Sequence, residues 1–106
     1  PELDTMLRHS ILVNTARGQV VDQKALYEAL VNGVIAGAAL DVTEIEPIPL
    51  DDPLLGLPNI IISPHMGSAT IRSRAGMADL ATRNLLAGLR GEIMPACANP
   101  EAIHNG

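Results

Sequence analysis

Three short, continuous apolar runs constrain the fold of this chain more than any other feature of its sequence. The strands that they predict cover residues 11–13, 35–42 and 59–63. Runs of this length without alternating polar residues are typical of strands in a parallel sheet whose two faces are covered. In residues 35–42 the small residues Gly37, Ala38 and Ala39 would allow a covering helix to pack closely. The sequence therefore predicts an α/β fold with a three-stranded parallel sheet.

The segment between the first two runs has the pattern of a short amphipathic helix. Asp22 is a suitable N-cap, Leu26 and Leu30 lie on one apolar face, and Gly33 is placed to end the helix. A strand, a helix and a second strand joined by short connections indicate parallel pairing with a right-handed crossover.

The segment between the second and third runs is expected to be mainly loop. Residues 47–58 contain four prolines, and we expect at most one helical turn there, around Leu54 and Leu55. After the third run, Thr70 is a suitable N-cap for a long helix that ends near Arg90. The expected apolar face of this helix consists of Ile71, Ala75, Ala78, Leu85 and Leu89.

We expect the two ends of the chain to contribute little to the sheet. Leu3, Met6 and Leu7 have helical spacing, so residues 1–10 are predicted to be the tail of a helix. Residues 96–106 are predicted to be a flexible tail. The predicted domain therefore covers residues 1–95.

Composition excludes several classes of function. Of the 106 residues 47% are apolar, and the net charge of −5 argues against a nucleic-acid surface. No apolar stretch is long enough to span a membrane, and Cys97 is the only cysteine, so no internal disulfide is possible. We assign no metal ligand, and we expect a cytoplasmic location.

Ionisable residues follow each of the three runs. Arg17 follows the first run, Asp41, Glu44 and Glu46 end or follow the second, and His65 follows the third. Parallel strands bring their carboxyl ends to one edge of the sheet, where open α/β sheets bind ligands. These side chains are therefore expected to lie near one another.

Each of these residues has an ordinary structural explanation when taken alone. A histidine in a turn can be purely structural, and glutamates in a proline-rich loop are commonly solvated. Together they form a site that could reduce a carbonyl group. Arg17 would hold a carboxylate and polarise the carbonyl, His65 would supply a proton, and Glu46 would favour the protonated imidazole.

The order and spacing of several motifs resemble those of the D-isomer-specific 2-hydroxyacid dehydrogenases. The resemblance runs from about residue 6 to residue 95. Within this family the chain looks most like the glyoxylate and hydroxypyruvate reductases. The motifs are NTARG at residues 14–18, GAALDV at 37–42, Glu46-Pro47, PHMGSAT at 64–70 and NLLAGLRGE at 84–92.

The resemblance implies roles for the residues at the sheet edge. Arg17 would bind the carboxylate and keto oxygen of a small 2-oxoacid. His65 would be the proton donor in reduction, and Glu46 its partner. The cofactor would be NAD(P), with contacts from Ala16, Arg17, Asp41, His65 and Gly67.

Parts of the family pattern are absent from this chain. It has no G-x-G-x-x-G motif, which binds the cofactor pyrophosphate, and no separate substrate domain. The resemblance therefore implies the nicotinamide-side half of a Rossmann-like NAD(P)-binding domain with flanking helices. Since the chain begins at Pro1 without a methionine, we expect a fragment or a processed product, inactive by itself.

Three other interpretations remain open. The chain could be a non-catalytic NAD(P)-binding module, like the corepressors related to this family, or a fragment that associates with full-length subunits. It could also be an α/β piece without any activity. Because a three-stranded parallel sheet leaves uncovered edges and faces, we expect association, most simply into a homo-oligomer.

Overall fold

The computed structural model describes residues 2–101. By its internal contacts the chain divides into two compact units, and the boundary along the sequence lies between Gly67 and Ser68. We describe each unit by itself.

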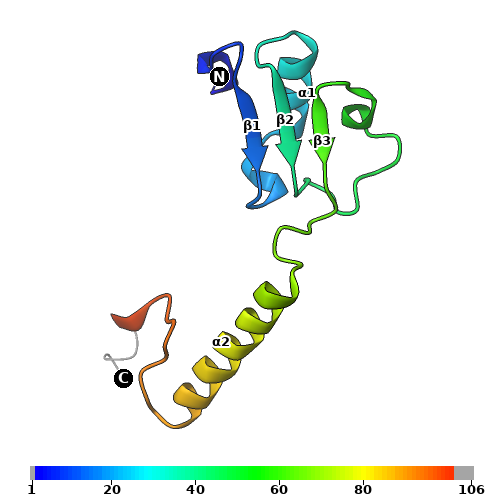
Figure 1. The fold of residues 1–106 in the computed structure, drawn as a ribbon. Helices are drawn as coiled ribbons and strands as arrows, with labels where there is room; N and C mark the ends of the chain where they lie inside the picture. The colour runs from blue at the N-terminus through cyan, green and yellow to red at the C-terminus, as the bar shows by residue number, and fades with distance from the viewer. Residues whose placement is uncertain (1, 102–106) are drawn as a thin grey trace. The chain divides into compact units, whose positions relative to one another are not determined.

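The first unit is built on a three-stranded parallel sheet, as predicted. Its strands are β1 (Ile11–Asn14), β2 (Gly37–Leu40) and β3 (Ile60–Ile62), in the spatial order β1-β2-β3 (Figure 1). Strands β2 and β3 are shorter than the strands predicted at residues 35–42 and 59–63. The register places Leu12 of β1 beside Ala38 of β2, and Ala38 beside Ile60 of β3. All three carboxyl ends therefore meet at one edge.

One face of the sheet packs against helix α1 (Gln23–Val31), behind the strands in Figure 1. The helix begins at Asp22, whose Oδ1 accepts a hydrogen bond from the Ala25 amide, and the chain leaves it through Gly33 at a φ of 62°. Both ends agree with the prediction. The core between the helix and the sheet consists of Leu26, Ala29, Leu30, Ile35, Ala38, Leu40 and Leu54.

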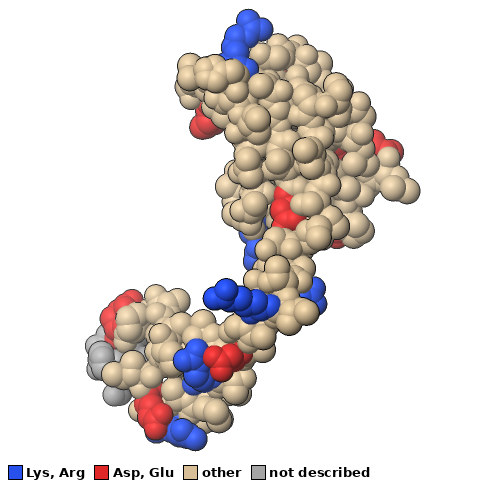
Figure 2. All heavy atoms as spheres, in the orientation of Figure 1, with Lys and Arg blue, Asp and Glu red and all other residues tan. Residues whose placement is uncertain are grey.

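The opposite face of the sheet is apolar and exposed. Ile11 and Val13 of β1 are each 65% exposed, and Ile61 of β3 is 72% exposed. This face is turned toward the viewer in Figure 2, where it carries few charged atoms. Strands of this type are usually covered on both faces, whereas α1 covers only one face here, which agrees with the uncovered face expected from the sequence.

Three short 3-10 helices complete the first unit: η1 (Leu3–Thr5), η2 (Gly18–Val20) and η3 (Pro53–Gly56). The last is the predicted helical turn in the proline-rich segment. The first corrects the prediction of a helical tail over residues 1–10. Leu3 and Met6 pack against the core at a spacing of three, which a single 3-10 turn satisfies, whereas Leu7 is 64% exposed.

The second unit contains helix α2 (Ile71–Leu89). Its N-cap is Thr70, whose Oγ1 accepts a hydrogen bond from the Ser73 amide, and Arg90 is the C-cap, both as predicted. The expected apolar face is largely exposed, with Ile71 90% and Leu89 76% accessible. Within the described part of the chain, no helix is long and apolar enough to cross a membrane.

The segment after α2 is only partly described. The side chain of Asn84 exchanges two hydrogen bonds with the backbone of Ala96, at 2.9 and 3.0 Å. Residues 102–106 of the predicted flexible tail lie outside the described residues.

Candidate active site

Buried polar residues are concentrated at the carboxyl edge of the sheet. Asn14, the last residue of β1, is 5% exposed, and Asp41 and Thr43, which follow β2, are 9% and 6% exposed. Every fully buried polar side-chain atom in residues 2–101 has a hydrogen-bond partner. Polar groups are buried in a protein only where such bonds compensate their desolvation, so these side chains organise the loops around them.

The loop after β1 is organised by Asn14. Its Oδ1 accepts a hydrogen bond from the Ala16 amide at 3.1 Å, and its Nδ2 donates one to the Arg17 carbonyl at 2.8 Å. These bonds form an asparagine-stabilised turn. Arg17 is exposed, and its guanidinium donates to the Ala16 carbonyl at 2.7 Å. The backbone of the arginine is therefore fixed while its side chain remains accessible.

The loop after β1 lies directly against the segment after β2. A Cβ atom at Gly18 would lie 2.0 Å from the carbonyl carbon and oxygen of Thr43. No side chain fits in that space, so glycine is required at this position. This close approach brings Arg17 and Glu46 to the same part of the edge.

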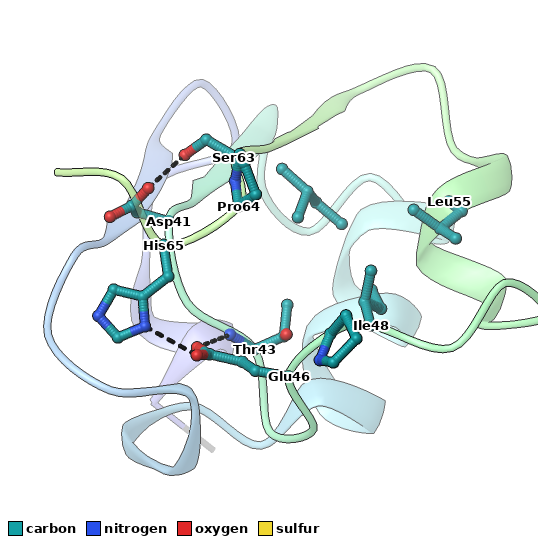
Figure 3. A pocket seen from close by; sticks show the side chains of 10 residues that line it. Asp41, Thr43, Glu46, Ile48, Leu55, Ser63, Pro64 and His65 are labelled. Carbon is teal, nitrogen blue, oxygen red and sulfur yellow. Dashed lines mark hydrogen bonds and ion pairs between the residues drawn. The ribbon is translucent and has the colours of Figure 1, made fainter. Parts of the chain in front are cut away.

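Glu46 and His65 are paired directly. The Nδ1 atom of His65 lies 2.7 Å from Oε2 of Glu46, while Oε1 of Glu46 accepts a hydrogen bond from the Thr43 amide at 3.2 Å (Figure 3). The hydroxyl of Thr43 in turn donates to the Ile45 carbonyl at 2.7 Å. Both oxygens of the glutamate therefore have fixed partners, and the carboxylate holds one nitrogen of the imidazole.

The carboxyl group of Glu46 is stabilised in its ionised form. The hydrogen bond with His65 is the largest cause of a pKa below the ordinary value, followed by the Thr43 amide and by the positive charges of His65 and Arg17. Glu46 is therefore a carboxylate at neutral pH. A histidine beside such a carboxylate has the arrangement expected of a general acid or base.

Asp41 holds the loop that carries the histidine. Its Oδ1 accepts hydrogen bonds from the Ser63 hydroxyl at 2.6 Å and from the Met66 amide at 2.8 Å, and its Oδ2 accepts one from the Gly67 amide at 2.8 Å. These three bonds, that from Ser63 foremost, lower the pKa of Asp41 below its ordinary value. Asp41 is therefore ionised as well.

A cavity of about 460 Å³ adjoins the paired side chains. Its polar wall includes Glu46 and His65, and its apolar wall includes Ile48, Leu55 and Ile62 (Figure 3). Apolar surroundings lower the local dielectric constant and so strengthen the interaction of the charged groups that border them.

The structure brings some of the predicted site residues into direct contact and leaves others apart. Glu46 is paired with His65, and Asp41 with the backbone of Gly67. Arg17 makes no hydrogen bond to either member of the pair within residues 2–101, although its charge contributes to the lowered pKa of Glu46. The cofactor roles predicted for these residues and for Ala16 stay predictions.

Sequence reasoning missed three residues that organise the site: Asn14, Thr43 and Ser63. Each is a short polar residue at the carboxyl end of a predicted strand, which was the available signal. By contrast Glu44, expected at the edge, accepts a hydrogen bond from the Gln23 amide at the start of α1 at 2.9 Å. It supports that helix instead of the histidine.

Comparison with known proteins identifies the family of this chain. Residues 1–67 match the family described as D-isomer specific 2-hydroxyacid dehydrogenase, NAD binding domain. A glyoxylate reductase of Korarchaeum cryptofilum is 56% identical over 102 residues, which are 96% of this chain and 31% of the relative. The human glyoxylate reductase/hydroxypyruvate reductase is 55% identical over 91 residues, which are 86% of this chain and 28% of the relative.

Solved structures agree with the sequence matches. An NADPH-dependent glyoxylate/hydroxypyruvate reductase from Sinorhizobium meliloti, in complex with NADP and malonate, has a TM-score of 0.73 and 45% identity, over 80% of this chain and 26% of that one. A D-isomer specific 2-hydroxyacid dehydrogenase from Xanthobacter autotrophicus, in complex with NADPH and MES, has a TM-score of 0.79 and 36% identity, over 95% of this chain and 41% of that one.

The chain spans about a third of the length of the curated relatives it matches. Its three parallel strands are part of a Rossmann domain, and the family match covers the whole of the first structural unit. On these grounds the chain belongs to the D-isomer-specific 2-hydroxyacid dehydrogenases and carries part of their NAD-binding domain.

Proposed function

We propose that the protein containing this chain reduces a small 2-oxoacid, such as glyoxylate or hydroxypyruvate, with NAD(P)H. The observation that carries the proposal is the 2.7 Å pair of His65 and Glu46 at the carboxyl edge of a parallel sheet. The names of the relatives support this class of substrate. Within this chain, the proposed catalytic residues are Arg17, Glu46 and His65.

The geometry of the pair suits proton donation to a carbonyl oxygen. Glu46 holds Nδ1 of His65, and the Nε2 atom makes no hydrogen bond to residues 2–101. In Figure 3 this nitrogen points away from Ile48 and Leu55. In the proposed reduction the imidazolium gives its proton through Nε2 to the keto oxygen and becomes neutral, while Glu46 keeps its charge.

The proposed role of Arg17 is to bind the substrate's carboxylate and polarise its carbonyl group. A guanidinium binds a carboxylate through two parallel hydrogen bonds, which also orient the molecule. The accessible side chain on a fixed backbone suits this role, because the guanidinium can reach a ligand without moving the loop.

The described residues fit the nicotinamide end of a dinucleotide better than its phosphate end. The backbone at Ala16 and Gly67 carries small side chains or none, which leaves room beside it for a flat ring. Bound NAD(P)H would supply the hydride that reduces the carbonyl carbon. Since the chain has no glycine-rich phosphate motif, we make no choice between NAD and NADP.

The test is an assay of the polypeptide as its source makes it. We expect oxidation of NADH or NADPH on addition of glyoxylate or hydroxypyruvate. Arg17→Ala should lower kcat/KM by about 100- to 1,000-fold, the usual effect of losing a donor to a developing oxyanion.

Arg8→Ala is the matched control. Arg8 lies before β1 and makes a long, 3.4 Å hydrogen bond to the Gly33 carbonyl, so its loss should leave kcat/KM unchanged. Equal effects of the two substitutions would remove Arg17 from the mechanism, and a wild-type protein inactive with every 2-oxoacid tried would refute the proposed reaction.

A further inference from the structure

The backbone of His65 has an unusual conformation. Its φ is 51°, and it is the only residue other than glycine with a positive φ among residues 2–101. A residue with a Cβ atom is disfavoured in this left-handed region unless the surrounding structure holds it there. The direction of the imidazole toward Glu46 therefore depends on what holds the loop.

The groups that hold the loop belong to Asp41. Its carboxylate accepts hydrogen bonds from Ser63, two residues before the histidine, and from the amides of Met66 and Gly67, which follow it. The backbone on both sides of His65 is thus tied to one side chain. Asp41 directly follows β2, whereas the loop that carries His65 follows β3.

Two further observations show that the carboxylate of Asp41 packs closely against the loop that carries His65. Asp41 is only 9% exposed, so few of its hydrogen bonds could be replaced by water. A Cβ atom at Gly67 would lie 2.9 Å from Oδ2 of Asp41, closer than Cβ atoms come to other heavy atoms in proteins. Glycine at this position therefore permits the approach of the carboxylate to the loop.

We propose that Asp41, together with Ser63, is a positioning residue that fixes His65 in its left-handed conformation and so directs the imidazole at Glu46. Among the described residues, Asp41 makes no hydrogen bond to the imidazole, and it acts through its bonds to Ser63 and to the backbone of Met66 and Gly67. The catalytic consequence rests on the proposed function. The family resemblance implies a different role for Asp41, a contact with the cofactor. Loss of that contact would raise the KM for NAD(P)H, whereas loss of positioning would lower kcat.

The experiment compares Ser63→Ala, Ser63→Thr and Asp41→Asn in the polypeptide as its source makes it. We expect Asp41→Asn to lower kcat about 100-fold, because an ångström of misplacement costs about that much. Ser63→Ala should cause a smaller loss, and Ser63→Thr, which keeps the hydroxyl, should restore kcat. The KM for NAD(P)H should stay unchanged in all three variants. Asp79→Asn, on the exposed surface of α2, is the matched control and should leave kcat unchanged.

Crystal structures of the variants supply a readout independent of turnover. The distance from Nδ1 of His65 to Oε2 of Glu46 should exceed 2.7 Å in Ser63→Ala and return to that value in Ser63→Thr. An unchanged distance in Ser63→Ala would overturn the proposal, as would an increased KM for NAD(P)H at unchanged kcat in Asp41→Asn. A wild-type protein without reductase activity would refute the proposed function only, since the distances would still test the positioning. If Asp41→Asn does not fold, the two Ser63 variants decide.

Discussion

The two ionised carboxylates at the sheet edge have different tasks. Glu46 contacts the imidazole of His65, whereas Asp41 contacts the backbone on either side of it. In both cases the hydrogen bonds stabilise the ionised carboxylate, and this lowers the pKa of each acid. The local structure of the loop therefore depends on pH.

We predict that this loop loosens in acid. A carboxyl group with a lowered pKa stabilises the folded state fully above its ordinary pKa and loses that contribution as the pH falls through the lowered value. For Asp41 this places the loss below about pH 4. The amides of Met66 and Gly67 should then lose protection against hydrogen exchange.

The Ala16 amide is an internal control for this prediction. It donates to the side-chain amide oxygen of Asn14, which does not titrate, so its protection factor should change little over the same pH range. Equal loss of protection at Ala16 and Gly67 would show general unfolding and contradict the prediction.

Sequence reasoning found the charged residues of the site but not the groups that hold them. Arg17, Glu46 and His65 were recognised because they follow three strands whose carboxyl ends meet at one edge of the sheet, and because their motifs resemble those of a known family. The hydrogen bonds of Asn14, Thr43 and Ser63 depend on loop conformations that no spacing of residues reveals. The same holds for the positive φ of His65, because a positive φ is uncommon in residues other than glycine, although histidine is enriched among the exceptions.

At the scale of elements, the strands follow from continuous apolar runs, and helices α1 and α2 follow from apolar periodicity and N-cap residues. Asp22 and Thr70 were predicted as N-caps and are confirmed by their hydrogen bonds. The predicted helical tail at residues 1–10 was wrong, because the spacing of Leu3 and Met6 fits a single 3-10 turn as well as it fits an α-helix. Short segments carry too few turns for the period to be decided from sequence.

We predict that Gly18→Ala separates the loops after β1 and β2. Its Cβ would overlap the Thr43 backbone, which cannot move as a flexible side chain can. The free energy of unfolding should fall by about 3 kcal/mol or more, the upper part of the range for overpacking. Urea denaturation of wild type and variant measures this change.

Gly56→Ala is the matched control, because no atom lies within 4 Å of the position its Cβ would take. That substitution should leave the free energy of unfolding within about 1 kcal/mol of wild type. A Gly18→Ala protein as stable as Gly56→Ala would show that the two loops are not in close contact.

At the scale of the whole molecule, each unit taken by itself has apolar side chains at its surface. Ile11, Val13 and Ile61 are exposed on the sheet of the first unit, and most apolar residues of α2 in the second unit are exposed. The limits of the predicted domain, residues 1–95, and of the tail stay predictions. Sequence indicated that strands of this kind need covering on both faces, but it could not say which residues would cover the second face.

We predict that the isolated 106-residue chain associates in dilute solution and shows negligible reductase activity. Association would bury the exposed sheet face and the free edges of β1 and β3. Light scattering over a range of concentrations measures the first property and NADPH oxidation with glyoxylate the second. A stable monomer would contradict the first part of the prediction, and turnover above that of the Arg17→Ala chain would contradict the second.

The most direct test of the account is the kcat of His65→Asn for hydroxypyruvate, measured beside wild type in the polypeptide as its source makes it. Asparagine tolerates the left-handed backbone at this position, so the variant removes the imidazole without requiring the loop to move. If His65 donates the proton, kcat should fall at least about 100-fold, the lower range for general acid catalysis. A kcat close to that of wild type would contradict the proposed mechanism.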